Sequence, residues 1–147
     1  MIKQAAIICD IDGTIANIGH RMKYWRQSPR DYHSFYKDLE SDSPIINIIE
    51  AVNVLSNAYH VIYLTGRHEG VRRKTIQWLE RNNLPAGKLI MKPDTCFDSD
   101  VEFKRSAYFS QISKTNEIIL VFEDRIKCVN MWREIGLTCL QVAEGNY

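Results

Sequence analysis

Five short apolar runs, each separated from the next by a longer segment, place the strongest limits on how this chain can fold. The runs are AAIIC (5–9), HVIYLT (60–65), KLIMK (88–92), EIILVF (117–122) and TCLQVA (138–143). Most are apolar on both faces, which is typical of parallel strands that helices cover from each side. Apolar residues recur every three to four positions over 44–58, 69–83, 101–113 and 125–135. The pattern predicts an open α/β sheet of five mainly parallel strands, built of right-handed βαβ units.

Local signals place the ends of three of these helices. Pro44 is expected to begin the first helix, because its fixed φ suits the first helical position. Asn83-Leu84-Pro85 closes the second helix, and Gly136 ends the last. Residues 17–43 do not fit the alternation, because they are too many for an ordinary loop. We expect this insertion to contain a short helix or two beside the strand ends.

Length and composition favour one domain, 1–147, and exclude several classes of protein. The 147 residues are 45% hydrophobic and 25% charged, a balance that suits a buried core and argues against disorder. The net charge of +1 provides no overall basic field, so a nucleic acid would have to bind at a local patch. The four cysteines form no CxxC pair, and no apolar run approaches the length of a membrane span. We expect free thiols, no membrane contact and a cytoplasmic location.

Polar residues gather where three of the predicted strands end. The ends read Asp10-Ile11-Asp12-Gly13-Thr14, Thr65-Gly66-Arg67 and Glu123-Asp124-Arg125. Open α/β sheets bind ligands beyond the carboxyl ends of their strands. The side chains of Asp10 and Asp12 share one face of an extended chain, so their like charges repel each other unless a cation lies near. The three clusters together predict one binding site at this edge of the sheet.

These motifs resemble, in type and order, those of the haloacid dehalogenase (HAD) superfamily of phosphohydrolases. The likeness rests on DIDGT (10–14), TGR (65–67), Lys104 and the pair Glu123-Asp124. The chain is most similar to the phosphatase domain of the bacteriophage polynucleotide kinase–phosphatase group, through Arg21 and the closing segment 123–147. The resemblance covers nearly the whole chain. It implies a HAD-like Rossmannoid fold with a small helical insertion in place of a full cap.

The resemblance implies a role for each acid of the first motif. Asp10 would be the nucleophile that forms an aspartyl-phosphate, which divides hydrolysis into two in-line steps. Asp12 would protonate the leaving oxygen and then activate water, while its backbone carbonyl would bind the metal. The implied cofactor is Mg²⁺, which few carboxylates, substrate phosphate and water can hold. Gly13 would allow the sharp turn after the strand, and Thr14 would brace it.

The acidic pair that follows the fourth strand has two interpretations. In the family-based one, Asp124 is the second carboxylate that binds the metal and Glu123 supports it from behind. Glu123 stands where an aspartate is more common, which leaves its role open. In the alternative, both acids lie at a solvated helix N-terminus, where the helix dipole favours them. The presence of the first motif favours the metal role.

The remaining site residues follow from the same likeness. Thr65, Gly66 and Lys104 would hold the phosphoryl oxygens, and Lys104 would neutralise charge in the transition state. Arg67 would either contact the substrate phosphate or pair with a carboxylate at the sheet edge. Asp100 would steady Lys104 or a substrate-binding arginine. Taken alone, Lys104 would be a solvent-facing helix lysine.

The insertion suggests which phosphate ester is bound. It is too small for a full cap, so the site should stay open to a macromolecular end. Arg21 matches a substrate-binding position of the family. Basic and aromatic residues alternate around it, a composition typical of single-strand binding surfaces: Arg21, Lys23, Arg26, Arg30 and Lys37 with Tyr24, Trp25, Tyr32, Phe35 and Tyr36. Alternatively, the rings pack on the sheet edge, an arrangement we favour for Phe35 and Tyr36 and leave open for Tyr24 and Trp25.

The leading hypothesis is an Mg²⁺-dependent phosphatase that removes a 3′-phosphate from DNA or RNA ends during nucleic-acid repair. A phosphatase of free nucleotides or other small phosphomonoesters is the enzymatic alternative, and a non-catalytic nucleic-acid-binding module is the alternative of another class. The sequence contains no GxxxxGK[ST] phosphate loop, so a kinase activity, or a ligase, would be supplied separately. For a phage-encoded protein the location would be the host cytoplasm. The oligomeric state is left open.

Overall fold

All five predicted strands form, and they pair in parallel in the order β5-β4-β1-β6-β7. Their bounds are β1 (Gln4–Cys9), β4 (His60–His68), β5 (Lys88–Lys92), β6 (Asn116–Arg125) and β7 (Cys139–Gly145). The computed structural model describes all residues 1–147. The predicted α/β sheet is therefore confirmed, with β1 at its centre.

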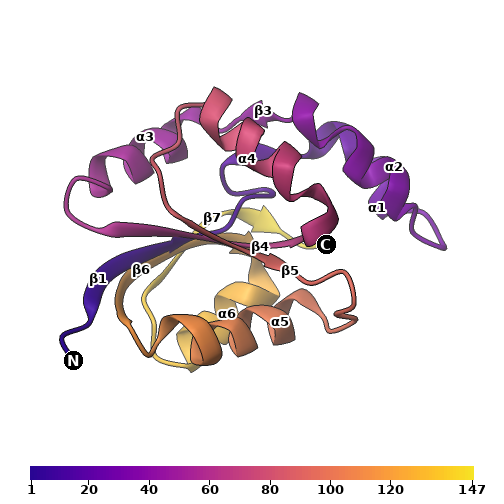
Figure 1. Cartoon of the computed structure of the whole chain (residues 1–147). Helices are drawn as coiled ribbons and strands as arrows, with labels where there is room; N and C mark the ends of the chain where they lie inside the picture. The colour runs from indigo at the N-terminus through magenta and orange to yellow at the C-terminus, as the bar shows by residue number, and fades with distance from the viewer.

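Helices cover both faces of the sheet (Figure 1). On one face lie α3 (Ile46–Leu55) and α4 (Arg72–Arg81), and on the other lie α5 (Asp100–Ala107) and α6 (Ile126–Glu134). A 3₁₀ turn, Glu69–Val71, precedes α4, and a π-helical turn, Tyr108–Ile112, follows α5. The predicted ends of α4 and α6 are confirmed, since Asn83 and Gly136 adopt positive φ just beyond them.

Alternation along the central strand explains the two-sided burial. Ala6 and Ile8 face the apolar cluster under α5 and α6, whereas Ile7 and Cys9 face the one under α3 and α4. A tryptophan anchors each cluster: Trp132 on α6 and Trp78 on α4, both with 0% of their surface exposed. The strands are apolar on both faces because each face is a core.

The insertion forms the short helices that the sequence predicts. It contains β2 (Ala16–Asn17), a 3₁₀ turn (Gly19–Arg21), α1 (Met22–Trp25), α2 (Tyr32–Lys37), a second 3₁₀ turn (Leu39–Ser41) and β3 (Ser43–Pro44). Ile18, Met22 and Phe35 form its own small core, against which Trp25 and Tyr36 pack. The aromatic residues therefore serve in part as the packing that fixes the insertion beside the strand ends.

The expected start of the first long helix is wrong. Pro44 lies in β3, opposite Ala16 of β2, and the Ile45 N–H donates to the Ile15 carbonyl at 2.8 Å. These antiparallel contacts hold the backbone extended through Pro44, so α3 begins at Ile46. The pairing returns the chain from the insertion to the sheet.

The described chain contains no helix that is both long and apolar enough to cross a membrane. Cys9, Cys96, Cys128 and Cys139 are free cysteines.

Candidate active site

Five of the residues predicted to act in the site line one small pocket. Asp10 and Asp12 follow β1, Thr65 and Gly66 lie near the end of β4, and Lys104 reaches in from α5. The pocket has a volume of about 30 Å³, and its walls include Trp25, Phe35 and Tyr36 of the insertion. Three elements that are far apart in sequence therefore meet at the carboxyl edge of β1, as the parallel topology requires.

A buried lysine lies between two buried carboxylates at the centre of this site. The Lys104 ammonium donates to Asp10 Oδ1 and to Glu123 Oε2, each at 2.7 Å. Burial alone would lower the pKa of Lys104, but the charges of Asp10 and Glu123 outweigh it and raise the pKa well above its usual range. Lys104 is therefore a permanent cation and not a solvent-facing helix residue. Its burial and pairing favour the interpretation of Lys104 as a residue of the site over that of a solvent-facing lysine.

Glu123 and Asp124 do not lie at a solvated helix N-terminus. β6 continues to Arg125, three residues beyond the predicted strand end, and both acids are buried inside it. Burial, followed by the neighbouring charge of Asp10, raises the pKa of Asp124 to about 6. Burial and then Glu123 raise the pKa of Asp10 to about 7. This cluster of carboxylates is therefore short of positive charge even with Lys104 present.

The donor atoms fit a hard divalent cation. Three carboxylate oxygens lie within 4.8 Å of one another, one each from Asp10, Glu123 and Asp124. The Tyr147 hydroxyl donates to Asp124 Oδ2 at 2.7 Å and lies 3.4 Å from the Asp12 carbonyl oxygen, so these two oxygens lie on either side of one hydroxyl. Oxygen ligands of this kind suit Mg²⁺. Glu123 has both oxygens occupied, Oε2 by Lys104 and Oε1 by the Asp124 N–H at 3.1 Å, whereas Asp10 contacts Lys104 through Oδ1 alone. The ligands best placed are therefore Asp10, Asp124 and the Asp12 carbonyl.

The Asp12 side chain points to two buried arginines. Its Oδ1 accepts from Arg21 Nη2 at 2.8 Å, from Arg67 Nη2 at 2.6 Å and from Arg67 Nε at 3.0 Å. Burial would raise the pKa of Asp12, but the positive charges of Arg67 and Arg21 lower it to about 2. All three bonds use Oδ1, and the Oδ2 atom makes no hydrogen bond within the protein. That second oxygen is the one available to a substrate.

Asp42, which sequence analysis missed, completes this arginine cluster. Its carboxylate accepts from Arg21 Nε at 2.7 Å, from Arg21 Nη2 at 2.6 Å and from Arg67 Nη2 at 3.1 Å. Its backbone carbonyl accepts from the indole of Trp78. Neither arginine side chain exposes any surface, so both are paired within the protein. The burial of both arginines points to a second acid, because two buried positive charges need more than the single negative charge of Asp12 to balance them.

Asp100 does not pair with Lys104, in contrast to one of the two roles considered for it. Its carboxylate contacts Lys92 Nζ at 3.5 Å and Arg125 Nη1 at 2.5 Å. Arg125 in turn donates to the backbone oxygen of Tyr147 at 2.7 Å. A Cβ at Gly66 of β4 would lie 2.6 Å from the Asp100 carboxylate, so a larger residue there would displace Asp100 from this pair. Thr65 accepts from the Arg67 N–H through its hydroxyl at 3.1 Å, within the pocket wall.

Gly13 allows the backbone to pass directly beneath Asp124. Its φ is +80°, and a Cβ there would lie 2.1 Å from Asp124 Oδ2 and 2.6 Å from the Tyr147 hydroxyl. The Gly13→Ala variant should therefore displace the Asp124 carboxylate and weaken Mg²⁺ binding about 10- to 100-fold. Titration of the purified variant with Mg²⁺ by calorimetry measures this loss.

Gly136→Ala is the matched control for that experiment. Gly136 has φ +90°, but a Cβ at this position would have no atom within 4 Å, so its replacement tests backbone strain alone. The strain costs about 1–2 kcal/mol of folding free energy. It should leave the Mg²⁺ affinity unchanged. Equal Mg²⁺ affinities of Gly13→Ala and wild type would show that Asp124 does not bind the cation.

Comparison with known proteins agrees with this geometry. A family model described as "Polynucleotide kinase PNKP phosphatase domain" matches residues 4–147. The chain belongs to this family. It is 27% identical over 137 residues to a putative bifunctional polynucleotide kinase/RNA ligase of Autographa californica nuclear polyhedrosis virus; the match covers 90% of this chain and 18% of that relative.

Solved structures show the same relationship for this PNKP-type phosphatase domain. One chain in the structure of a Pnkp1/Rnl/Hen1 complex superposes with a TM-score of 0.84 and 25% identity, over 99% of this chain and 48% of that chain. A haloacid dehalogenase-like family protein of Streptococcus pneumoniae superposes with a TM-score of 0.64 and 16% identity, over 96% of this chain and 85% of that chain. The resemblance to the HAD superfamily is thereby confirmed, and the fold is HAD-like. The chain spans less than half the length of the first two relatives.

Proposed function

We propose that this domain is an Mg²⁺-dependent phosphatase that removes the 3′-phosphate from a polynucleotide through an aspartyl-phosphate intermediate. The observation that supports it best is the position of Asp10. Its carboxylate lies at the end of the central strand, beside the buried Lys104 cation and within 4.8 Å of the Asp124 ligand oxygen. A nucleophilic carboxylate and a phosphate repel each other; Lys104 supplies part of the positive charge that offsets this repulsion, and Mg²⁺ held by Asp10 and Asp124 would supply the rest.

In the first step, an Asp10 oxygen attacks phosphorus in line with the leaving ribose oxygen. The P–O bond to the ribose breaks as the bond to Asp10 forms, and Asp12 Oδ2 delivers a proton to the departing oxygen. Asp12 holds that proton only when the phosphate dianion lies beside it, because a nearby negative charge raises the pKa of a carboxyl group. Arg21 and Arg67 keep Oδ1 fixed, so the free oxygen faces the leaving group.

In the second step, water attacks the same phosphorus and the bond to Asp10 breaks. Asp12 accepts the proton of the water, and phosphate leaves. Lys104 donates to Asp10 Oδ1 in the resting site and is placed to stabilise the equatorial oxygens as charge builds on them. When bound, Mg²⁺ would neutralise charge on the transferring phosphoryl group.

The relatives also suggest a setting for this reaction. One is named a kinase/RNA ligase and another belongs to a Pnkp1/Rnl/Hen1 assembly. We infer that this phosphatase acts on DNA or RNA ends in repair, beside a kinase or ligase activity that this stretch of chain does not encode. The same proposal places it in the cytoplasm, that of the host if a phage encodes it.

A substrate panel with and without Mg²⁺ tests the proposal. We expect phosphate release from a 3′-phosphorylated oligonucleotide in Mg²⁺, a loss of turnover when EDTA removes the cation, and little release from the 5′-phosphorylated form of the same oligonucleotide. Free 3′- and 5′-mononucleotides complete the panel. Equal or faster turnover of the mononucleotides would contradict the polynucleotide assignment, and full activity in EDTA would contradict the metal requirement.

A further inference from the structure

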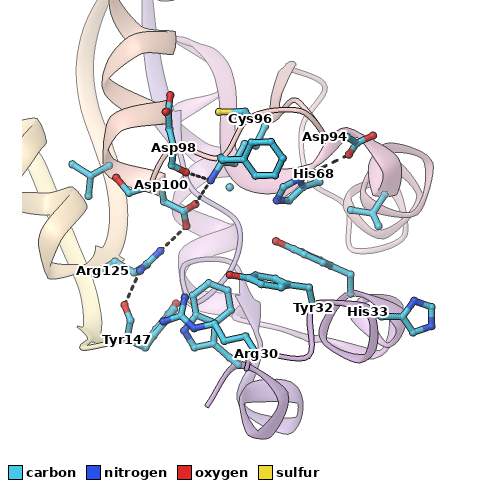
Figure 2. Close-up of a pocket in the computed structure, with 18 of the residues that line it drawn as sticks. Arg30, Tyr32, His33, His68, Asp94, Cys96, Asp98, Asp100, Arg125 and Tyr147 are labelled. Atoms are coloured by element: carbon cyan, nitrogen blue, oxygen red, sulfur yellow. Dashed lines mark hydrogen bonds and ion pairs between the residues drawn. The ribbon is translucent and has the colours of Figure 1, made fainter. Parts of the chain in front are cut away.

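A second, much larger cavity opens directly onto the catalytic pocket. Its volume is about 1040 Å³, and it lies between the insertion and the loop that joins β5 to α5 (Figure 2). The two cavities share lining residues, namely Trp25, Tyr36, Gly66, Asp100, Arg125 and Tyr147. A ligand whose phosphate reaches Asp10 can therefore extend into the larger cavity without a break.

Exposed aromatic rings line both walls of this cavity. Tyr32, on the insertion, is 49% exposed and projects from the lower wall in Figure 2. Phe97, on the opposite loop next to Cys96, is 95% exposed. Trp25 packs edge-on against Tyr32, and the centroids of the two rings are 5.9 Å apart. Almost none of the Phe97 ring is buried within the protein, so its ring is available for a ligand.

The charge of the walls is predominantly positive. Six Lys and Arg side chains line the cavity, against three Asp. Lys74, Lys92 and Arg125 are paired with carboxylates of the protein. Arg30, Lys37 and Lys127 form no ion pair, and Arg30 instead lies over the Trp25 ring at 4.1 Å. These three cations are free to contact an anionic ligand.

We propose that this cavity binds the single-stranded nucleotides next to the phosphorylated end, with bases stacked on Tyr32 and Phe97 and phosphates near Arg30, Lys37 and Lys127. The inference rests on the proposed function and adds the form of the substrate. Aromatic platforms combined with a basic groove are the means by which proteins hold single strands. In a duplex every base face except the outer face of the terminal pair is covered by a neighbour, so a blunt end cannot place successive bases on both rings. The enzyme should therefore prefer single-stranded ends.

Two alanine variants test the stacking surfaces. Tyr32→Ala and Phe97→Ala should each lower kcat/KM for a 3′-phosphorylated single-stranded oligonucleotide by about 5- to 150-fold. Neither residue lines the catalytic pocket, so turnover of p-nitrophenyl phosphate should stay within about twofold of wild type. Phe109→Ala is the matched control, because Phe109 is an exposed phenylalanine of the π-helical turn outside the cavity. This control should change the turnover of neither substrate.

The contribution of the unpaired cations to binding is tested by the salt dependence of the affinity for the oligonucleotide. Lys127→Gln should reduce the slope of log affinity for the oligonucleotide against log salt by about 0.7, the value for one phosphate contact with a single strand. Lys114→Gln, which removes an exposed lysine outside the cavity, should leave the slope unchanged.

The outcomes separate this inference from the proposed function. Hydrolysis of p-nitrophenyl phosphate without hydrolysis of any oligonucleotide would overturn the polynucleotide assignment and the inference with it. Hydrolysis of the oligonucleotide at wild-type rates by both alanine variants would overturn the inference alone. The same holds if a blunt duplex end is dephosphorylated as fast as a single-stranded end, because the two rings would then lie outside the path of the substrate.

Discussion

The Asp10→Asn variant is expected to fold as the wild type does and to lose at least about 10³-fold in turnover. Asparagine has the shape of aspartate but no charged oxygen that can attack phosphorus. Its amide oxygen can still accept from Lys104, and the Thr14 hydroxyl, 3.0 Å from the other position, can accept from its NH₂ group. The variant also removes one of the like charges that surround Asp124, so the fold should not be weakened. Phosphate release under single-turnover conditions measures the loss.

Glu50→Gln is the control for this variant. Glu50 is an exposed acid on α3 that lines neither cavity, and its replacement changes the net charge by the same amount. Circular dichroism and thermal unfolding should be the same for both variants and the wild type. Turnover of Asp10→Asn within tenfold of the wild type would show that another residue is the nucleophile.

The Asp42→Asn variant is expected to lower the free energy of unfolding by about 3–5 kcal/mol. Asp42 is 4% exposed and accepts hydrogen bonds from both Arg21 and Arg67. Without its charge, two fully buried guanidinium groups would share the single carboxylate of Asp12. Breaking one side of a buried ion pair is costly because the remaining charge stays out of water. Urea unfolding monitored by tryptophan fluorescence measures the change.

Asp38→Asn serves as the matched control, because Asp38 is an exposed acid of the same insertion and its side chain makes no capping bond. It should change the stability by less than about 0.5 kcal/mol. Turnover of Asp42→Asn should also fall, since Arg21 and Arg67 fix the Oδ1 atom of Asp12. A stability within about 1 kcal/mol of the wild type would show that the two arginines do not depend on the charge of Asp42.

Sequence patterns located the apolar part of each strand but not the polar ends of the strands. The runs at 60–65 and 117–122 are each shorter than the strands they belong to, β4 and β6, by three residues or more. The extensions are polar, so hydropathy does not mark them, and they are held by pairing with neighbouring strands beyond the apolar core. The start of α3 at Ile46 was missed for a similar reason: Pro44 satisfies a local helix rule, but pairing with Ala16 keeps it extended.

The same distinction applies to the site. The roles implied for Asp10, Asp12 and Asp124 follow from motifs that are continuous in sequence, and the fold brings these residues together. Asp42 belongs to no motif, and Tyr147 lies in the closing segment 123–147 without a role predicted for it, yet they contact the arginine pair and the Asp124 carboxylate. Arg21 was expected to bind substrate, and its guanidinium group is fully buried between Asp12 and Asp42. A role of Arg21 toward the substrate therefore passes through Asp12.

The sequence by itself determined the parallel sheet, the order of its elements and the motifs at the strand ends, because periodicity and turn residues act over a few neighbouring positions. The tertiary structure alone decided which charges pair. Lys104 lies between Asp10 and Glu123, and Asp100 contacts Arg125 instead. Ion pairing in a buried site depends on distances of about 3 Å between groups that are up to about a hundred residues apart, and no local pattern encodes such distances.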